Sequence, residues 1–395
     1  MHKKTIRDIE IKGKRVLVRV DFNVPLDPET NAISDDSRIR AVLPTIRYLV
    51  EKGSKVILCS HLGRPKGRVV EELRLAPVAK RLSELLGLPV ASAGDCIGPE
   101  VEEAVSRLNE GDALLLENLR FHAEEEKNNL EFAEALSRLA DVYVNDAFGA
   151  AHRAHASTAG IAQYLPAVAG FLMEKEVDFL SKALTEPAHP FAAITGGAKV
   201  SDKLGLLENI MGKVDSLLIG GGMCCTFLKA QGYSVGQSRV EEDKLDFARK
   251  LMDKAASAGV KLILPSDVIV AESFASGVPC KTVSVSEIPE NYYVMDIGPS
   301  TVDEFATEIR KCKTVMWNGP MGVFEYKEFR NGTEAIAREL AKLEATTILG
   351  GGSTAEAVEE LGLADRMSHV STGGGASLEF LEGKILPGVE VLQDK

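Results

Sequence analysis

The sequence lacks any long apolar segment. No run approaches the roughly 18 apolar residues of a membrane span, and the N-terminal residues MHKKTIRDIE lack the apolar core of a signal peptide. Positive charge is not in excess either, because 46 Lys and Arg stand against 58 Asp and Glu, which gives a formal net charge of −12. A general nucleic-acid binder normally carries a basic face. We therefore expect a cytoplasmic enzyme with neither a membrane nor a nucleic-acid partner.

The sequence also contains no CxxC pair and no GxxxxGK[ST] motif. Its six cysteines are scattered, several of them in apolar runs: Cys59, Cys96, Cys224, Cys225, Cys280 and Cys312. We expect reduced, partly buried thiols rather than disulfides or zinc ligands. The missing GxxxxGK[ST] motif argues against a P-loop NTPase.

The chain is long enough for two domains, since 395 residues exceed one ordinary core. Its first half alternates short apolar runs with helix-length amphipathic segments, a pattern typical of a parallel sheet covered by helices. The strands expected there are residues 15–20, 55–59, 113–117 and 141–145.

Basic residues follow these expected strands. Ligands collect outside the carboxyl ends of the strands in open α/β sheets. The residues that lie there or close by are Arg38, His61, Arg64, Arg120, His152 and Arg153. A single such arginine is more often an ordinary surface residue, but four of them favour a pocket, because guanidinium groups match carboxylate and phosphate oxygens two at a time.

Residues 171–186 form an expected amphipathic helix with Met173, Val177, Leu180 and Leu184 on one stripe, followed by two prolines. It is either a core helix or an interdomain connector. The second half then repeats strands followed by glycine-rich loops. The strands expected there are residues 216–219, 261–264, 293–296, 314–317, 346–349 and 368–371. We expect these glycines to let the backbone approach a nucleotide-sized ligand.

Residues 191–203, FAAITGGAKVSDK, lie near the midpoint of the chain. An apolar strand that passes through two glycines into a helix predicts an anion site, because the free N–H groups and the positive end of the helix dipole face the ligand. If Lys199 and Lys203 fall in the first helical turns, they share one face and reach the same polyphosphate.

The two halves together favour phosphoryl transfer, with an arginine pocket for a small anionic acceptor and a glycine-lined pocket for a nucleotide. A nicotinamide-dependent dehydrogenase is the alternative enzyme, because residues 350–355 satisfy GxGxxA. No acidic residue ends the next expected strand to bind a ribose hydroxyl, so that motif is weak evidence. A third possibility is a catalytically silent, anion-sensing binding protein of the same fold.

Six motifs in order carry a resemblance to a known family. They are RVDFNVP at 19–25, SHLGRP at 60–65, ENLRF at 117–121, AHRAH at 151–155, GGAKVSDK at 196–203 and WNGPMGVFE at 317–325. The chain resembles the phosphoglycerate kinases from residue 19 to residue 377. The resemblance implies two doubly wound, Rossmann-like α/β domains, at residues 1–170 and 187–386, joined by a hinge helix at 171–186. It also implies that the tail, residues 387–395, packs back on the first domain.

The resemblance also implies an activity and a set of site residues. The activity is reversible phosphoryl transfer from 1,3-bisphosphoglycerate to ADP by a monomer. The residues implied for 3-phosphoglycerate are Asp21, Phe22, Asn23, Arg38, His61, Leu62, Gly63, Arg64, Arg120, His152 and Arg153. Those implied for the nucleotide are Gly197, Ala198, Lys203, Gly221, Gly222, Asn318, Glu325, Gly351, Gly352, Ser353 and Thr354. Those implied for the transferring group are Arg38, Lys199, Gly374 and Gly375.

One position departs from the family pattern. The late glycine loop usually reads GGGDS or GGGDT, and its aspartate helps to hold the Mg²⁺ that ATP or ADP carries, whereas this chain has Ser353. A neutral hydroxyl does not supply the charge that a hard divalent cation prefers. We therefore assign no protein ligand to the metal.

Some residues carry ordinary structural expectations. Trp317 is expected in the core or a pocket wall, and His122 and His189 are expected to be ordinary polar residues. Residues 124–127, EEEK, are expected in a solvated loop or at a helix start.

Overall fold

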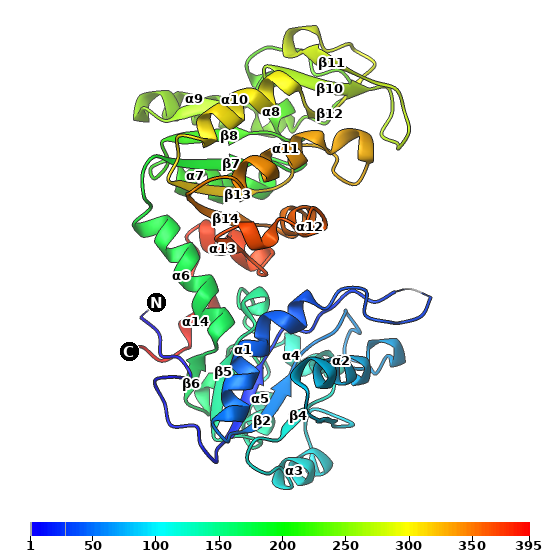
Figure 1. The fold of residues 1–395 in the computed structure, drawn as a ribbon, viewed down its shortest axis with the longest axis vertical. Coiled ribbons are helices and arrows are strands. Elements are labelled where there is room, and N and C mark those ends of the chain that lie inside the picture. The colour runs from blue at the N-terminus through cyan, green and yellow to red at the C-terminus, as the bar shows by residue number, and fades with distance from the viewer. Residues whose placement is uncertain (1, 28) are drawn as a thin grey trace. The chain divides into compact units, whose positions relative to one another are not determined.

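The computed structural model describes residues 2–27 and 29–395, and the chain folds into two compact units (Figure 1). Unit 1 is Met1–Asp178 together with Ile385–Lys395, and unit 2 is Phe179–Lys384. Among the described residues, no helix is long and apolar enough to cross a membrane.

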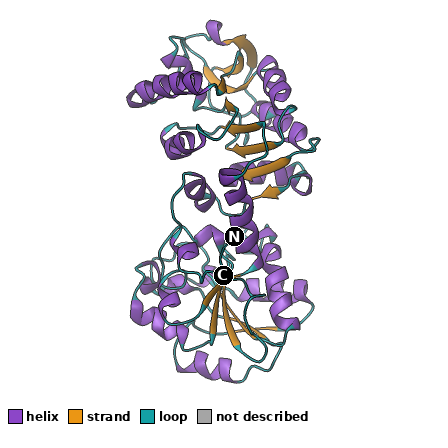
Figure 2. Cartoon of the chain, turned by 90° about the vertical axis from the view of Figure 1, so that its left-hand side faces the viewer, coloured by secondary structure: helices purple, strands orange, loops and turns teal. Residues whose placement is uncertain are grey.

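Unit 1 is built on a six-stranded sheet whose strands all run parallel, in the order β3-β4-β2-β1-β5-β6. The strands are β1 (Arg15–Arg19), β2 (Lys55–Cys59), β3 (Val90–Ser92), β4 (Ala113–Leu115), β5 (Val142–Asn145) and β6 (Ala167–Ala169). The helices are α1 (Ser37–Glu51), α2 (Ala76–Leu86), α3 (Pro99–Ser106), α4 (Ala123–Glu126), α5 (Leu130–Ser137) and α14 (Pro387–Glu390). Figure 2 shows helices on both sides of these strands, which is why the strands read as continuous apolar runs.

Unit 2 contains a second parallel sheet of six strands, in the order β15-β14-β13-β7-β8-β9. The strands are β7 (Phe191–Thr195), β8 (Ser216–Ile219), β9 (Lys261–Ile263), β13 (Thr314–Asn318), β14 (Thr346–Gly350) and β15 (His369–Val370). The helices are α7 (Leu204–Ile210), α8 (Cys224–Ala230), α9 (Leu245–Ala258), α10 (Pro299–Ile309), α11 (Asn331–Leu340), α12 (Gly352–Glu360) and α13 (Gly375–Leu381). The predicted fold class, two parallel α/β units, is confirmed. The prediction for Trp317 is also confirmed, because its side chain is fully buried in the core of this sheet.

One strand prediction was wrong about its partners. Residues 293–296 were expected in the parallel βα series, but β12 (Tyr293–Ile297) pairs antiparallel with β10 (Asp267–Ala271), which also pairs with β11 (Cys280–Ser284). These three strands form a small separate sheet, visible as a group in Figure 1. Strand β10 was not predicted, because only three residues separate it from β9 (Lys261–Ile263) and the sequence analysis placed one strand at 261–264 followed by a loop.

Helix α6 (Phe171–Thr185) includes the boundary between the two units. Its predicted apolar stripe is confirmed for three of its four residues, because Met173 and Leu180 are fully buried and Val177 is 5% exposed, whereas Leu184 is only half-buried. The C-terminal residues lie with unit 1: the side chain of Asn145 donates a hydrogen bond to the carbonyl of Gly388 (2.9 Å).

All six cysteines are free thiols, as predicted, and five of them are buried.

Candidate active site

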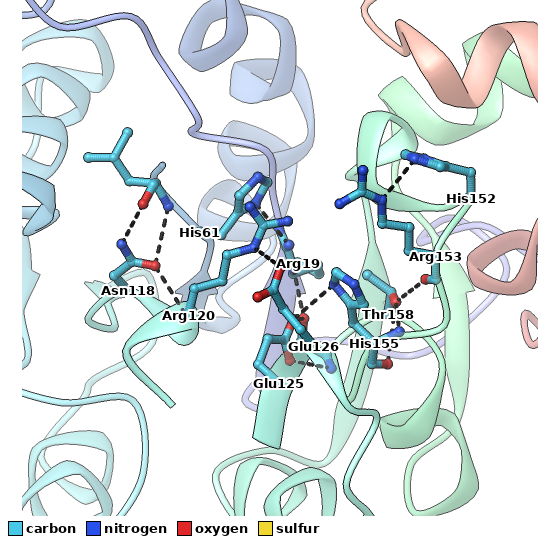
Figure 3. A network of polar contacts seen from close by, with 12 residues as sticks. Arg19, His61, Asn118, Arg120, Glu125, Glu126, His152, Arg153, His155 and Thr158 are labelled. Atoms are coloured by element: carbon cyan, nitrogen blue, oxygen red, sulfur yellow. Dashed lines mark hydrogen bonds and ion pairs between the residues drawn. The ribbon is translucent and has the colours of Figure 1, made fainter. Parts of the chain in front are cut away.

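The basic residues of unit 1 follow four neighbouring strands. In the sheet order β4-β2-β1-β5, Arg120 follows β4, His61 and Arg64 follow β2, Arg38 follows β1, and His152 with Arg153 follow β5. The carboxyl ends of parallel strands share one edge of the sheet, so these side chains gather there. Figure 3 shows His61, Arg120 and Arg153 around one region. We call six residues the basic cluster: Arg38, His61, Arg64, Arg120, His152 and Arg153.

Asp21 partly neutralises the positive charge of the basic cluster. Its carboxylate lies 2.6 Å from Nη1 of Arg38. Burial opposes its ionisation, but the guanidinium groups of Arg38 and Arg19 and the backbone N–H of Asn23 favour the carboxylate, and the pKa of Asp21 is lowered. Burial, together with the nearby arginines, lowers the pKa of His61 well below its ordinary value. His61 is therefore a neutral hydrogen-bonding group at neutral pH rather than a cation.

Two asparagines hold the loops of this edge. Asn23 accepts a hydrogen bond from the backbone N–H of Gly63 (2.8 Å). Asn118, which the sequence prediction left out of the site, bonds to both the N–H and the carbonyl of Leu62 and accepts from the N–H of Arg120. Arg120 in turn donates to the carbonyl of Gly63 (2.9 Å). The loops that carry the predicted ligands thus form one connected frame.

Two of the predicted substrate residues have buried side chains that pack in the core of unit 1. The side chain of Phe22 is fully buried in the hydrophobic core, and that of Leu62 is 2% exposed. These two side chains support the loops from the core, so a contact of Phe22 or Leu62 with the substrate would be made by the backbone. Arg64 and Arg153 are exposed, and Nε of Arg153 donates to Nε2 of His152 (3.1 Å).

A buried ionic network lies behind the basic cluster and was not predicted. Arg19 is fully buried and contacts Nδ1 of His61 (3.1 Å) and Oγ of Ser157 (2.9 Å). Ser157 donates to Glu125 (2.5 Å), and Figure 3 shows Glu125 beneath the cluster. The helix start predicted at 124–127 is correct, but Glu125 is fully buried rather than solvated, because it compensates the buried charge of Arg19. Burial raises the pKa of Glu125, although Arg19 opposes that effect.

Unit 2 contains two adjoining cavities. Cavity A, about 570 Å³, includes Cys225, Phe274, Tyr293 and Glu325 in its wall. Cavity B, about 520 Å³, is lined by Lys199, Asp202, Lys203, Asn318, Gly351, Gly352, Thr354, Gly374 and Gly375, among others. Four residues line both cavities: Gly197, Ala198, Pro320 and Ser353. The predicted nucleotide residues therefore lie together, with Gly222 in cavity A; Gly221 is the exception, since it lines neither cavity.

The glycines of these loops have two different roles. Gly221 (φ +62°) and Gly319 (φ +97°) face other backbone: an added Cβ would lie 2.5 Å from the nitrogen of Gly197 and 2.3 Å from the carbonyl oxygen of Gly196, respectively. These two glycines pack loop against loop. Gly197, Gly352 and Gly374 would meet nothing within 4 Å and fit the predicted close approach to a ligand.

The 191–203 segment differs from its prediction. Strand β7 leads into the two glycines, and Lys203 ends a 3-10 helix (Ser201–Lys203) that runs directly into α7, whereas Lys199 precedes the helical residues. The N–H groups of Val200 and Ser201 are already bonded to the carboxylate of Glu241 (2.6 and 3.1 Å). The anion bound at this turn is thus a side chain of the protein, and the two lysines still line cavity B.

Positive potential in cavity B comes from the lysines and from helix α12. This helix begins at Gly352, its N-cap Gly351 has φ +90°, and no side chain caps it. Its exposed start supplies N–H groups and the positive dipole end, which stabilise anions. Lys203 donates to Oδ1 of Asn318, and burial lowers the pKa of Lys203 to about 8. Asp202 is the one carboxylate among the described residues that line this cavity.

Comparisons with known proteins agree over the whole chain. The sequence profile of the family described as phosphoglycerate kinase matches residues 6–384. Phosphoglycerate kinases from Pelotomaculum thermopropionicum (59% identity over 395 residues) and Synechococcus elongatus (60% over 401 residues) are matched over 100% of both chains. The structure of phosphoglycerate kinase from Coxiella burnetii matches with a TM-score of 0.88 at 43% identity, and that from Pyrococcus horikoshii with 0.86 at 34%, each over 98% of both chains. The chain belongs to the phosphoglycerate kinase family.

Proposed function

We propose that this chain transfers a phosphoryl group reversibly between 1,3-bisphosphoglycerate and ADP, giving 3-phosphoglycerate and ATP. The observation that carries the proposal is the presence, in one chain of this family, of an arginine-rich edge in unit 1 and of a lysine- and glycine-lined cavity in unit 2. One suits a small acid that carries phosphate, and the other suits a nucleotide with its phosphates.

Unit 1 is the proposed site for 3-phosphoglycerate. Arg38, Arg64 and Arg120 offer guanidinium groups that pair with carboxylate or phosphate oxygens two at a time. Asp21, Asn23, neutral His61, His152 and Arg153 complete the proposed site. The acceptor carboxylate is already ionised near neutral pH, so the transfer needs no general base.

Unit 2 is the proposed site for the nucleotide. Cavity A, with its aromatic wall and Glu325, suits the base and ribose, whereas cavity B suits the phosphates. Lys203 and the start of α12 would bind the nucleotide phosphates. Lys199, Arg38 and the Gly374–Gly375 backbone would stabilise the phosphoryl group during transfer, when its charge is spread over the equatorial oxygens.

The nucleotide would carry Mg²⁺ into this site. Mg²⁺ usually takes one or two carboxylates together with phosphate oxygens and water. The donors of cavity B fit that pattern: Asp202 supplies a carboxylate, and Ser353 supplies a hydroxyl at the position where the family pattern has aspartate. When bound, the ion would neutralise charge on the phosphates, and Asp202 would hold it from the protein side.

We propose direct in-line transfer, which requires the two units to close around the moving group by bending at α6. Closure would exclude water that otherwise hydrolyses the acyl phosphate. We also expect a cytoplasmic monomer. Small-angle scattering tests closure: the radius of gyration should fall when 3-phosphoglycerate and Mg-nucleotide are both present, and an unchanged radius would contradict it.

A coupled assay with 3-phosphoglycerate and MgATP tests the activity itself. Folded protein should turn over, and no turnover with either Mg²⁺ or Mn²⁺ would refute the kinase and favour a silent binding protein. The dehydrogenase alternative rested on residues 350–355 alone and is not favoured by the family membership. Binding of NAD in preference to ADP would be its signature.

A further inference from the structure

Three side chains with metal-binding atoms converge in unit 1, apart from the basic cluster. Asp95 and Cys96 lie in the loop after β3, and His122 lies between the 3-10 turn Leu119–Phe121 and helix α4. A carboxylate oxygen, the Cys96 sulfur and an imidazole nitrogen all lie within 4.8 Å of one another. Nε2 of His122 is 2.7 Å from Oδ1 of Asp95. These three residues are called the Asp95–Cys96–His122 cluster.

We propose that this cluster is a binding site for a divalent transition-metal cation, with Zn²⁺ the best match. Thiolate, imidazole and carboxylate are the three ligand types that Zn²⁺ takes in proteins, and a site with three protein ligands leaves the fourth position for water. A hard cation such as Mg²⁺ would not use a thiolate. The site departs from the sequence expectation that the cysteines are not zinc ligands and that His122 is an ordinary polar residue.

The geometry needs only a small side-chain adjustment. Ligand atoms around tetrahedral Zn²⁺ lie roughly 3.4 Å apart, as follows from bonds of about 2.0–2.3 Å. Nε2 of His122 and Oδ1 of Asp95 lie closer together than that, at 2.7 Å, and no two of the ligand atoms lie more than 4.8 Å apart. A cation would therefore replace the proton that joins the imidazole to the carboxylate and draw the Cys96 sulfur inward.

The surroundings of the cluster hold its ligands and admit an ion. Cys96 is fully buried, while the side chains of Asp95 and His122 are 52% and 27% exposed, so the ion would enter between these two. The ring of His122 packs on Phe132 with centroids 5.3 Å apart. The N–H of Cys96 donates to Oδ1 of Asp95 (2.7 Å), which fixes the carboxylate beside the thiol.

Binding of a divalent cation displaces the proton of the Cys96 thiol, so binding should weaken as the pH falls.

Titration of the full-length, chelator-treated chain with Co²⁺, in the absence of nucleotide, tests the proposal. Co²⁺ is a spectroscopic substitute for Zn²⁺, and bonding to a thiolate gives a charge-transfer absorption. We expect one equivalent of Co²⁺ with that absorption, displaced by one equivalent of Zn²⁺. Cys96→Ser should abolish the absorption, and His122→Gln should weaken binding at least about tenfold. The matched control, Cys280→Ser, removes an exposed thiol elsewhere and should change neither result.

The proposal would be overturned by the absence of any thiolate absorption in the wild-type chain, or by an absorption that persists in Cys96→Ser. If Cys96→Ser fails to fold, as circular dichroism would reveal, His122→Gln and Asp95→Asn decide instead, since both alter partly exposed side chains. Unchanged Co²⁺ affinity in both of these folded variants would equally overturn it. Binding of Co²⁺ at Asp202 in cavity B would give no thiolate absorption and counts against the proposal if it is the sole binding seen.

Discussion

Lys203 should make nucleotide binding depend on pH. Its pKa falls from 10.5 to about 8 because burial penalises the ammonium, and Asp202 and Glu382 only partly offset that penalty. A bound polyphosphate would restore the preference for the charged form. The nucleotide therefore binds best to the free protein whose Lys203 is protonated. Most Lys203 side chains are protonated at pH 7, and this fraction falls as the pH rises through 8.

The size of the effect follows from the two pKa values. If the bound lysine regains a pKa of 10.5 or more, the Kd for ADP should rise about tenfold between pH 7 and pH 9, which is about 1.4 kcal/mol. Proton uptake on binding should rise from about 0.1 to about 0.9 over the same interval.

Isothermal titration calorimetry at fixed ionic strength, in two buffers with different ionisation enthalpies, measures both quantities. The matched variant is Lys203→Arg, whose guanidinium stays charged throughout and should give a flat profile. A flat profile in the wild type, or an equal slope in Lys203→Arg, would refute the assignment of Lys203 to the nucleotide phosphates.

Three further outcomes follow from the site and the core. Lys199→Ala should abolish phosphoryl transfer while leaving the Kd for 3-phosphoglycerate within about twofold, as calorimetry and the coupled assay would show; loss of both would refute the division of roles. Ser353→Asp should tighten Mg²⁺-dependent ADP binding and Asp202→Asn should weaken it, and unchanged affinity in both would mean that the ion is held otherwise. Asp146 accepts hydrogen bonds from the N–H groups of Leu172 and Met173, and burial raises its pKa to about 7. Its contribution to stability is present below about pH 4 and is lost as the pH rises towards 7, by up to about 4 kcal/mol. Asp146→Asn keeps an acceptor oxygen but does not titrate. The urea midpoint of the variant minus that of the wild type should therefore increase from pH 4 to pH 7, and a difference that stays constant would contradict this.

The parallel strands were predictable because burial on both faces leaves a direct record in the sequence. Residues 55–59 and 216–219 were predicted with the bounds that β2 and β8 have. Strands β3 and β11 were missed because they are largely exposed and carry no apolar run. The antiparallel partner of β12 was missed because nothing in residues 293–297 records the direction of a neighbouring strand.

Site residues could be predicted where they lie together in one sequence motif. Contacts between residues far apart in the sequence could not be predicted. Lys199 and Lys203 were identified from their own segment. The Glu241 carboxylate that occupies the turn lies about 40 positions further on. The link from Arg19 through Ser157 to Glu125 also joins residues more than 100 positions apart. Such contacts depend on how loops meet in space. Gly221 looked like a ligand contact for the same reason, because close approach to backbone and close approach to a ligand both require glycine.

The central claim is that the two units bind different substrates, and a paired binding measurement tests it directly. Calorimetry should be run with 3-phosphoglycerate and with ADP on Arg64→Gln, an exposed position in unit 1, and on Lys203→Gln in unit 2. We predict that Arg64→Gln weakens 3-phosphoglycerate binding about tenfold or more and leaves ADP binding unchanged, with the reverse for Lys203→Gln. Weakened binding of the same ligand in both variants would contradict the claim.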